Sequence, residues 1–398
     1  MVRALVTGGA GFIGSHLVDR LMEAGHEVIV IDDLSSGSLD YLRTWNTSPR
    51  LRFIEADISD DVPDVGHVDV IYHLAADPEV RTSSMEPSRH YRRNVLATFN
   101  VLEFARRTGV GAFVFTSTST VYGEPRTIPT SEDYGPPIPI SIYGATKLAS
   151  EAMISAYANS YGFRAVILRL ANIVGSRSRH GVIHDFIMKL RANPDALEVL
   201  GDGTQSKSYL HVEDLVDAVL IAVERSRERV SVFNVGSEDR ISVLEIARIV
   251  SEEMGLSHVD MKLTGGPEGR GWTGDVKVMQ LDISRMESLG WRPKGNSEYA
   301  VRRAARELVE ELRRSSRRRL AVPARLAEGY VGLNYRGPDV IQSGISTERL
   351  EFAIAGNVLS NYHTSVTGLA LPNEVALVGL LLYAKYHEGL EQGERSPC

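Results

Sequence analysis

The chain has 398 residues, of which 43% are hydrophobic and 24% charged, a composition that is typical of soluble globular proteins and excludes disordered and fibrous classes. Its net charge of −7 argues against a nucleic-acid-binding protein, because such proteins neutralise phosphates with an excess of Lys and Arg. The apolar run at 375–384 has ten residues, about half of the roughly 20 that a membrane-spanning helix needs.

The single cysteine, Cys398, excludes disulfides within the chain and clustered thiolate metal sites. The first residues lead directly into an apolar segment, without the features of a signal peptide. We therefore expect a cytoplasmic protein with no membrane partner. None of the eleven histidines forms a close group with carboxylates at a spacing typical of metal sites, so we expect no metal.

Short apolar runs alternate with longer amphipathic stretches up to about residue 125. The runs predict strands, and the stretches at 13–23 and 90–107 predict helices. Strands that alternate with helices indicate a parallel sheet covered by helices on both faces. The predicted strands lie at 3–6, 27–31, 51–55, 68–73 and 112–116, with later strands of the same sheet at 165–170 and 232–235.

The predicted fold is an α/β, doubly wound parallel sheet with a smaller α/β lobe. Residues 1–176 form the sheet domain in this prediction, and 208–241 return to it. Residues 177–207 and 242–312 are more irregular and richer in Gly and polar side chains, which predicts a second lobe. Residues 313–398 form a C-terminal extension.

The extension begins where a predicted helix at 297–314 leads into the Arg-rich stretch 313–319, which is typical of a solvated linker. Further along, 347–361 and 374–388 have the pattern of amphipathic or apolar helices. We therefore expect a helical extension, and its sequence contains no motif that indicates a role.

A glycine-rich turn follows the first strand and precedes the first helix, with glycines at 8, 11 and 14. Gly8 allows a tight turn, Gly11 lets the backbone approach a pyrophosphate, and Gly14 permits close packing of the helix. Asp32 ends the second strand, where a carboxylate accepts hydrogen bonds from a ribose diol and repels a 2′-phosphate. Asp33 could share that role. The sequence therefore predicts a Rossmann domain that binds NAD, and a tight turn without a ligand is the alternative.

Tyr143 and Lys147 lie one helical turn apart, and a run of hydroxyl residues at 116–120 ends the strand before them. The carboxyl ends of strands are where open α/β sheets bind ligands. Because a free tyrosine titrates near pH 10, its use as a base near neutrality requires a nearby cation. Lys147 could supply that charge. A core tyrosine beside a surface lysine is the alternative.

Together these features resemble the extended short-chain dehydrogenase/reductase superfamily, and within it the UDP-glucose 4-epimerases among the NAD-dependent nucleotide-sugar epimerases. The resemblance covers about residues 1–312. Residues 313–398 have no recognised counterpart. The motifs that carry the resemblance are residues 7–14, 32–37, 73–76, 94, 116–123, 143 with 147, 168–172 and 201–204.

The resemblance implies an NAD that is used and regenerated within one turnover. Tyr143 would take the proton of the sugar 4-OH group, Thr118 would hydrogen-bond the reacting oxygen, and Lys147 would hold the nicotinamide ribose. A homodimer through the helices at 90–107 and 143–161 is also implied. The implied cofactor-binding residues are Gly8, Gly11, Phe12, Ile13, Gly14, Asp32, Asp33, Ser35, Ser36, Gly37, Asp57, Ile58, Leu74, Ala75, Ala76, Asn94, Thr116, Ser117, Tyr143, Lys147 and Leu170.

The substrate side departs from the family pattern at two positions. Lys207 stands where the family often has Arg, and Trp272 occupies the usual position of the diphosphate arginine, with Arg270 two residues earlier. Either Arg270 reaches the diphosphate by another path or this contact is lost. The implied UDP-sugar-binding residues are Thr118, Tyr143, Asn172, Val182, Ile183, Lys207, Arg270, Asp275 and Met279.

Several reactions remain open within this resemblance. The related 4,6-dehydratases carry acids at the positions of both Ser119 and Thr120, and the related UDP-xylose synthases carry one at the position of Thr120, so the absence of these acids favours simple C4 epimerisation. Arg177 and Arg179 could meet a diphosphate or a sugar carboxylate, which keeps UDP-glucuronate open. The flexible Met279 leaves N-acetylated sugars open. A nucleotide-sugar reductase and a non-catalytic NAD-binding scaffold also stay open.

Overall fold

The computed structural model describes residues 1–320, apart from the side chains of Pro267 and of residues 315–320. Residues Met1–Arg314 form one compact unit. The helices predicted at 347–361 and 374–388 lie outside the described residues.

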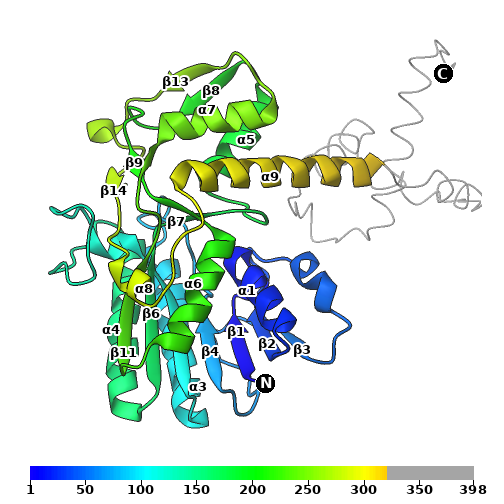
Figure 1. The fold of residues 1–398 in the computed structure, drawn as a ribbon, viewed down its shortest axis with the longest axis vertical. Helices are drawn as coiled ribbons and strands as arrows, with labels where there is room; N and C mark the ends of the chain where they lie inside the picture. Colours follow the sequence, from blue (N-terminus) through cyan, green and yellow to red (C-terminus); the bar gives the residue numbers. More distant parts are fainter. Residues whose placement is uncertain (321–398) are drawn as a thin grey trace, which may run out of the picture. The chain divides into compact units, whose positions relative to one another are not determined.

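A seven-stranded parallel sheet forms the centre of this unit (Figure 1). Its strands follow the order β11-β6-β5-β4-β1-β2-β3, which confirms the predicted doubly wound sheet. The order reverses between β1 and β4, where open α/β sheets bind their ligands. The strands are β1 Arg3–Thr7, β2 Glu27–Asp32, β3 Leu51–Glu55, β4 Val70–His73, β5 Ala112–Thr118, β6 Arg164–Leu170 and β11 Val230–Val235.

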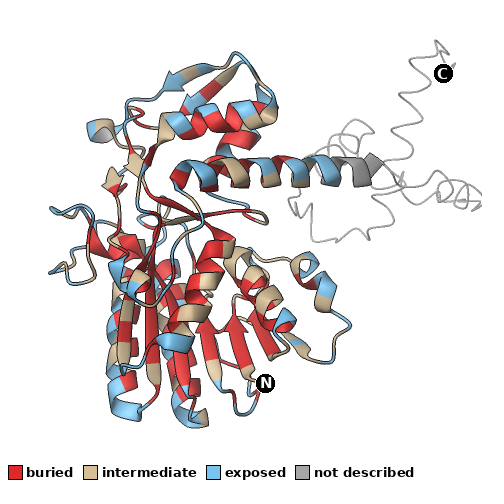
Figure 2. Cartoon of the chain, in the orientation of Figure 1, coloured by how far each residue is buried: buried red, intermediate tan, exposed pale blue. Residues whose placement is uncertain are grey.

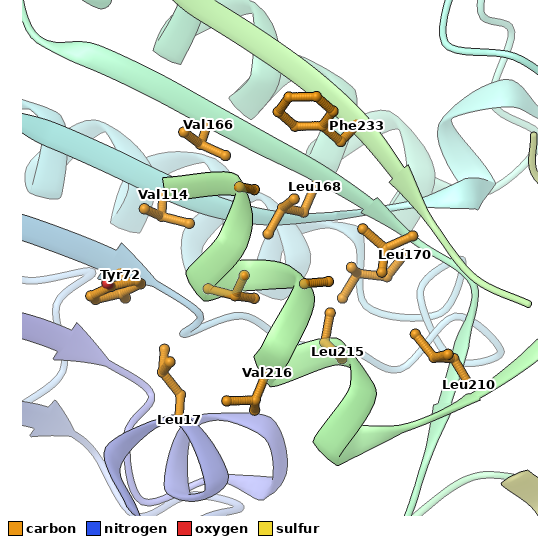
Figure 3. Close-up of a cluster of buried hydrophobic side chains, with 14 of the residues drawn as sticks. Leu17, Tyr72, Val114, Val166, Leu168, Leu170, Leu210, Leu215, Val216 and Phe233 are labelled. Carbon is orange, nitrogen blue, oxygen red and sulfur yellow. The ribbon is translucent and has the colours of Figure 1, made fainter. Parts of the chain in front are cut away.

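Helices cover both faces of the sheet, and buried residues fill the strands and the inner sides of the helices (Figure 2). On one face, α1 and α6 pack through Leu17 and Val216 against strand residues such as Val114 (Figure 3). On the other face, α3 and α4 pack against residues that include Phe113. Successive strand residues point to opposite faces, so continuous apolar runs serve both cores. The helices are α1 Phe12–Glu23, α3 Ala97–Thr108, α4 Ile142–Tyr161 and α6 Val212–Arg225.

A second lobe is built on its own hydrophobic core, to which α5, α7 and the first half of α9 contribute. The helix α7 begins with a capping box, in which Ser242 and Glu245 bond each other's backbone N–H groups. The lobe's elements and the short elements around it are β7 Asn172–Val174, α5 Val182–Ala192, β8 Ala196–Val199, β9 Ser206–Lys207, β10 Tyr209–His211, β12 Ile241–Ser242, α7 Val243–Met254, β13 Asp260–Leu263, β14 Val278–Met279, α8 Ser284–Ser288 and α9 Ser297–Leu320.

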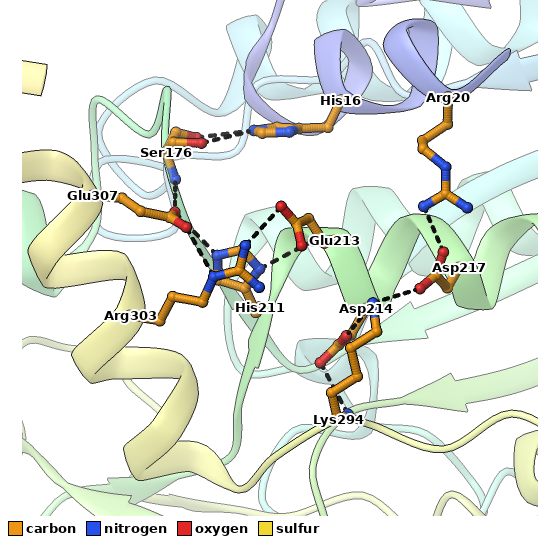
Figure 4. A network of polar contacts seen from close by, with 10 residues as sticks. All are labelled: His16, Arg20, Ser176, His211, Glu213, Asp214, Asp217, Lys294, Arg303 and Glu307. Atoms are coloured by element: carbon orange, nitrogen blue, oxygen red, sulfur yellow. Dashed lines mark hydrogen bonds and ion pairs between the residues drawn. The ribbon is translucent and has the colours of Figure 1, made fainter. Parts of the chain in front are cut away.

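A polar network joins α9 to the sheet domain (Figure 4). Glu307 of α9 accepts a hydrogen bond from the backbone N–H of Ser176 at 3.0 Å and lies 3.1 Å from His211 Nε2. The carbonyl oxygen of Ser176 is in turn 3.1 Å from His16 Nε2 of α1. These contacts hold the segment after β7 between α9 and the first helix of the sheet domain.

The single helix predicted at 90–107 is divided in the structure. It consists of α2 Pro87–His90, a π-helical turn Tyr91–Leu96, and α3. A π-helical turn has wider hydrogen-bond spacing and occurs frequently at functional sites. Here the turn carries Asn94, whose side chain bonds the loop after β4.

The last described helix is longer than predicted. The sequence indicates a helix that ends at 314 and a linker at 313–319, whereas α9 continues to Leu320. Arg is among the good helix formers, and Glu310 and Arg314 form an ion pair one turn apart with 3.3 Å between Oε2 and Nη2. The local propensity of the Arg-rich stretch therefore extends the helix.

Candidate active site

A cavity of about 840 Å³ runs from the glycine-rich turn past the end of β5 and the start of α4 to the second lobe. All of the predicted cofactor- and substrate-binding residues line it except Gly37, Asn94 and Arg270. Residues that lie far apart in the sequence therefore share one cavity at the strand-order reversal of the sheet.

At the turn between β1 and α1, the positions of Gly8 and Gly14 have no room for a side chain. Gly8 adopts a φ of +71°, which disfavours other residues. A Cβ atom at Gly14 would lie 2.1 Å from the carbonyl oxygen of Gly8, and one at Gly8 would lie 2.7 Å from the backbone nitrogen of Ala75. The N-cap residue Gly11 has no side chain to bond the first N–H groups of α1. The turn is therefore a cradle that fits the pyrophosphate of a dinucleotide.

Two carboxylates line the cavity where β2 ends: Asp32 is the last residue of the strand, and Asp33 follows it. Asp32 is 7% exposed and accepts hydrogen bonds from the backbone N–H groups of Ala10 at 2.9 Å and Leu34 at 2.8 Å. Burial raises the pKa of Asp32, and these two hydrogen bonds oppose the rise. The Asp33 carboxylate lies 3.4 Å from the guanidinium group of Arg93. Both acids remain at the cavity wall, where a ribose diol can donate to them.

Gly37 and Asn94 contact residues of this part of the cavity wall but do not line the cavity themselves. A Cβ atom at Gly37 would lie 2.9 Å from Asp32 Oδ1, so a glycine here leaves the room that the carboxylate occupies. Asn94 accepts a hydrogen bond from the Asp77 backbone N–H at 2.8 Å and donates to the Thr146 hydroxyl at 3.0 Å. The structure thus places both residues next to cavity-lining segments and outside the cavity lining itself.

Thr118 and Tyr143 meet where β5 ends and α4 begins. Thr118 is the last residue of β5, and its hydroxyl hydrogen-bonds the Tyr143 side chain. The N-cap residue Ser141 fixes the first turn of α4, because its hydroxyl accepts the Gly144 backbone N–H at 3.1 Å. Lys147 follows one turn later and lines the same cavity. The three predicted catalytic residues are therefore brought together.

Burial dominates the ionisation of this group. It raises the pKa of Tyr143 to about 12, and the charge of Asp77 adds to the rise while the Thr118 hydrogen bond opposes it. Burial also lowers the pKa of Lys147 to about 7, against the opposing charge of Glu151. A tyrosine with such a pKa can act as a base near neutrality only where added positive charge stabilises the phenolate.

The substrate side of the cavity contains one close ion pair and one unused donor. Lys207 Nζ lies 2.6 Å from Asp275 Oδ1 and 5.6 Å from the ring centroid of Trp272. Trp272 Nε1 is buried and has no hydrogen-bond partner within the described part of the chain. Asn172 donates to the Ser208 carbonyl oxygen at 3.2 Å. These groups can meet the hydroxyl and phosphate oxygens of a nucleotide.

Arg270 does not reach the cavity. Its guanidinium forms an ion pair with Glu124 and donates to the carbonyl oxygen of Asp275 at 2.7 Å. Of the two paths that the sequence left open for this arginine, the structure therefore shows the one in which it is held away from the substrate side.

The two arginines after β7 are also separated. Arg179 lines the cavity with its guanidinium 5.2 Å from the ring centroid of Tyr41. Arg177 is absent from the lining and pairs with Asp19 at 2.7 Å. Of these two arginines, Arg179 is therefore the one placed to meet a ligand group.

Sequence reasoning missed some residues of the cavity wall. Arg81 lies in the loop after β4, Arg93 in the π-helical turn, and His184 in α5. The loop could have been found, because it directly follows a predicted strand at the ligand-binding edge of the sheet. The directions of Arg93 and His184 depend on packing that the local pattern does not encode.

Two kinds of feature are not found within residues 1–320. There, no group of three or more His, Cys, Asp or Glu side chains is arranged to hold a metal ion. No helix in that part of the chain has the length and apolar character needed to cross a membrane.

Comparison with known proteins shows the family to which this chain belongs. The sequence profile of the NAD dependent epimerase/dehydratase family matches residues 4–236, more than half of the chain. The chain belongs to this family. The resemblance stated from the motifs is thereby confirmed, and the family's NAD is the dinucleotide that the glycine cradle and Asp32 fit.

Members of the family that are similar to this chain catalyse more than one reaction. A crystal structure of a UDP-galactose 4-epimerase has 48% identity and a TM-score of 0.70, and the match covers 78% of this chain and 99% of that one. UDP-glucose 4-epimerase of Mycolicibacterium smegmatis is 37% identical over 305 residues, which are 74% of this chain and 94% of that protein. UDP-glucuronic acid decarboxylase 6 of Arabidopsis thaliana is 35% identical over 302 residues, 74% of this chain and 84% of that protein.

Proposed function

We propose that the protein is an NAD-dependent 4-epimerase that interconverts UDP-glucose and UDP-galactose. The observation that carries the proposal is the Thr118–Tyr143 contact beside Lys147, at the junction of the dinucleotide cradle and the substrate side. Thr120 stands where both the 4,6-dehydratases and the UDP-xylose synthases of the resemblance have an acid, and Ser119 stands where the dehydratases have a second one, so the acids used in those reactions are missing. The similarity to two 4-epimerases supports the same reaction.

Each side chain has a defined task in this reaction. Tyr143 takes the proton of the sugar 4-OH group and later returns it, while Thr118 holds the reacting oxygen. Lys147 binds the cofactor ribose and adds the positive charge that the buried phenol needs. The glycine cradle and Asp32 would hold NAD, which would supply a reversible acceptor for the C4 hydride. The wide cavity supplies room for a 4-keto sugar to turn over between the two half-reactions.

A second candidate substrate is UDP-glucuronate. Arg81 lines the cavity, is exposed, and forms no ion pair or hydrogen bond with any described residue. An arginine of this kind can bind a sugar carboxylate with two parallel hydrogen bonds. The similarity to a UDP-glucuronic acid decarboxylase points to the same class of sugar.

The proposal includes a cytoplasmic homodimer. Large apolar side chains are exposed on the segments that the resemblance assigns to the dimer contact: Tyr91 at 58%, Phe99 at 41% and Tyr161 at 53%. Pairing of α3 and α4 with their copies would cover these side chains and form a four-helix contact.

The activity can be tested without any added reductant. Purified protein is incubated with UDP-glucose, UDP-galactose, UDP-glucuronate or the N-acetylated counterparts, and proton NMR follows the configuration at C4. We expect interconversion of UDP-glucose and UDP-galactose. Inversion of UDP-glucuronate alone would support the second candidate. No change at C4 in any of them would overturn the proposal. In a separate incubation with added NAD(P)H, net consumption of the reductant would overturn it as well.

A tyrosine variant tests the assigned base. Tyr143→Phe should lower the rate by about 10³-fold or more, because the proton of the 4-OH group loses its acceptor, while NAD stays bound. Tyr161→Phe is the matched control, since Tyr161 lies on the same helix and is 53% exposed. Comparable rates for both variants would remove Tyr143 from the mechanism.

A further inference from the structure

A buried ion pair lies one helical turn below Lys147. Glu151 of α4 is 5% exposed, and Arg169 of β6 is 8% exposed. Arg169 Nη2 donates to Glu151 Oε2 at 2.7 Å, and Nε lies 3.1 and 3.2 Å from the two carboxylate oxygens. The same carboxylate accepts the Ser117 hydroxyl at 2.5 Å. Glu151 therefore binds side chains from two neighbouring strands.

Stability alone does not account for such a pair. Removing two charges from water costs several kcal/mol per ion, and well-packed apolar residues of similar volume are often at least as stable. The position of Glu151 beside the catalytic group suggests another task.

The hydrogen bonds of Glu151 connect the two elements that carry the catalytic side chains. Ser117 directly precedes Thr118 in β5, and Lys147 precedes Glu151 by one turn on the same face of α4. Charge-assisted hydrogen bonds of this kind are short and strongly directional. A shift of the Glu151 carboxylate would thus move β5 relative to α4, and with it the contact between Thr118 and Tyr143.

Glu151 is also the carboxylate that acts on the buried Lys147 ammonium group. From α4 the charge of Glu151 acts on this group. From β4 it is faced by His73, whose pKa is lowered to about 3 by burial and by the charge of Lys147, so that His73 stays neutral. From β5 the ring of Phe115 lies 4.0 Å from Lys147 Nζ. Burial lowers the pKa of Lys147, and the Glu151 charge opposes this effect.

We propose that Glu151 is a positioning residue of the active site, held by Arg169 and Ser117, which aligns β5 with α4 and provides the counter-charge for Lys147. The part of this inference that concerns turnover rests on the proposed function. The counter-charge does not, because it concerns only residues of this chain.

Two single substitutions separate this role from a structural one. Glu151→Gln keeps the shape of the side chain and removes the negative charge, whereas Arg169→Gln leaves that charge without its partner. The pKa of Lys147 should therefore fall in Glu151→Gln and rise in Arg169→Gln. A purely structural pair would give shifts in the same direction, or none, in both variants.

The titration of Lys147 can be observed directly. The chain contains seven lysines, so ¹³Cε-lysine labelling gives few NMR signals, and Lys147→Met identifies the one of interest. We expect midpoint shifts of about one pH unit or more, in opposite directions, for the two single variants. The double variant Glu151→Gln with Arg169→Gln carries neither charge, so the two opposite effects should largely cancel and its Lys147 midpoint should lie between the midpoints of the single variants. A double variant with a midpoint outside that interval would contradict the counter-charge.

Enzyme kinetics give the second readout. Lys147 is active when protonated, so activity is lost as the pH rises through its pKa, and a lower pKa moves this loss to lower pH. Glu151→Gln should therefore show a basic limit shifted down by about one unit and a 10- to 100-fold lower kcat near neutrality, with KM changed less than about threefold. Glu103→Gln is the matched control, because Glu103 pairs with Arg106 near the surface of α3.

The outcomes distinguish the two proposals. Equal or absent shifts of the Lys147 titration in the variants would overturn the role of Glu151, whatever sugar the enzyme uses. Opposite shifts in a protein that inverts no UDP-sugar would support the counter-charge and overturn the proposed function. An unchanged kcat in Glu151→Gln, with the shifts present, would overturn the alignment of β5 with α4.

Discussion

At the level of single residues, the substrate side of the cavity is organised around the pair of Lys207 and Asp275. Asp275 is 3% exposed, and its carboxylate lies 2.6 Å from Lys207 Nζ. A buried carboxylate that loses its partner is strongly destabilising. Lys207 therefore stabilises the second lobe and also places a positive charge at the cavity wall, where a diphosphate can approach it.

Substitution of Lys207 should change two measured quantities, the KM for UDP-glucose and the free energy of unfolding. Lys207→Met should raise the KM for UDP-glucose at least about 10-fold and lower the free energy of unfolding by about 3 kcal/mol, because the buried Asp275 carboxylate loses its counter-charge and, among the described residues, keeps only the Gly271 backbone N–H at 3.2 Å. Initial rates and urea denaturation measure these effects. Lys207→Arg, which keeps the charge, should change KM less than about threefold. An unchanged KM in Lys207→Met would exclude contact with the substrate.

Residue types with a geometric requirement could be predicted from the sequence, and side-chain pairings could not. Gly8 and Gly14 are required by the turn itself, so their spacing predicts the cradle. Arg270 is in a recognisable motif, yet its direction depends on Glu124, which lies 146 positions earlier in the chain. The unused Nε1 of Trp272 likewise follows from tertiary packing.

At the level of elements, the β1–α1 turn forms a binding site because the backbone at Gly8 lies directly against the backbone at Gly14. The carbonyl oxygen of Gly8 accepts the Gly11 N–H at 3.1 Å and closes the turn beneath the start of α1. Because Gly14 lies against this carbonyl group, the helix can begin directly at the cavity. Its N-terminal N–H groups then face the place where a phosphate binds.

Replacing Gly14 should abolish cofactor binding through this turn. The Cβ atom of Gly14→Ala would lie 2.1 Å from the Gly8 carbonyl oxygen, so the turn must open and purified protein should retain little NAD. Gly109→Ala is the control: Gly109 has a φ of +67° but no atom within 4 Å of the added Cβ. It should cost about 1 kcal/mol of stability and leave NAD unchanged. Normal NAD content in Gly14→Ala, measured by chromatography, would contradict the cradle.

The predicted strands of the sheet correspond closely to the observed ones, because buried parallel strands are continuous apolar runs. The region at 90–107 differs, since a π-helical turn has no distinct apolar period and its wider spacing depends on contacts made by Asn94. The end of α9 differs because charge runs are typical of both linkers and exposed helices.

At the level of the whole molecule, the residues of the cavity lie between Gly8 and Leu308, within the unit Met1–Arg314. The sheet domain contributes the cradle and the group of Thr118, Tyr143 and Lys147, and the second lobe contributes Lys207 and Asp275. Cofactor and substrate would thus meet in one cavity, which a reaction at a single sugar carbon requires. The division into lobes follows from composition, whereas their closure on each other depends on contacts such as Arg270 with Glu124.

The fate of the C4 hydrogen distinguishes transient oxidation, in which this hydrogen leaves and returns, from inversion by exchange of the C4 hydrogen with water. UDP-glucose that carries deuterium at C4 is incubated with the purified protein, without added reductant, and NMR reads the product. The proposed mechanism predicts UDP-galactose that retains deuterium at C4, because the hydrogen leaves and returns within one turnover. A product with solvent hydrogen at C4, or no inversion at C4, would contradict it.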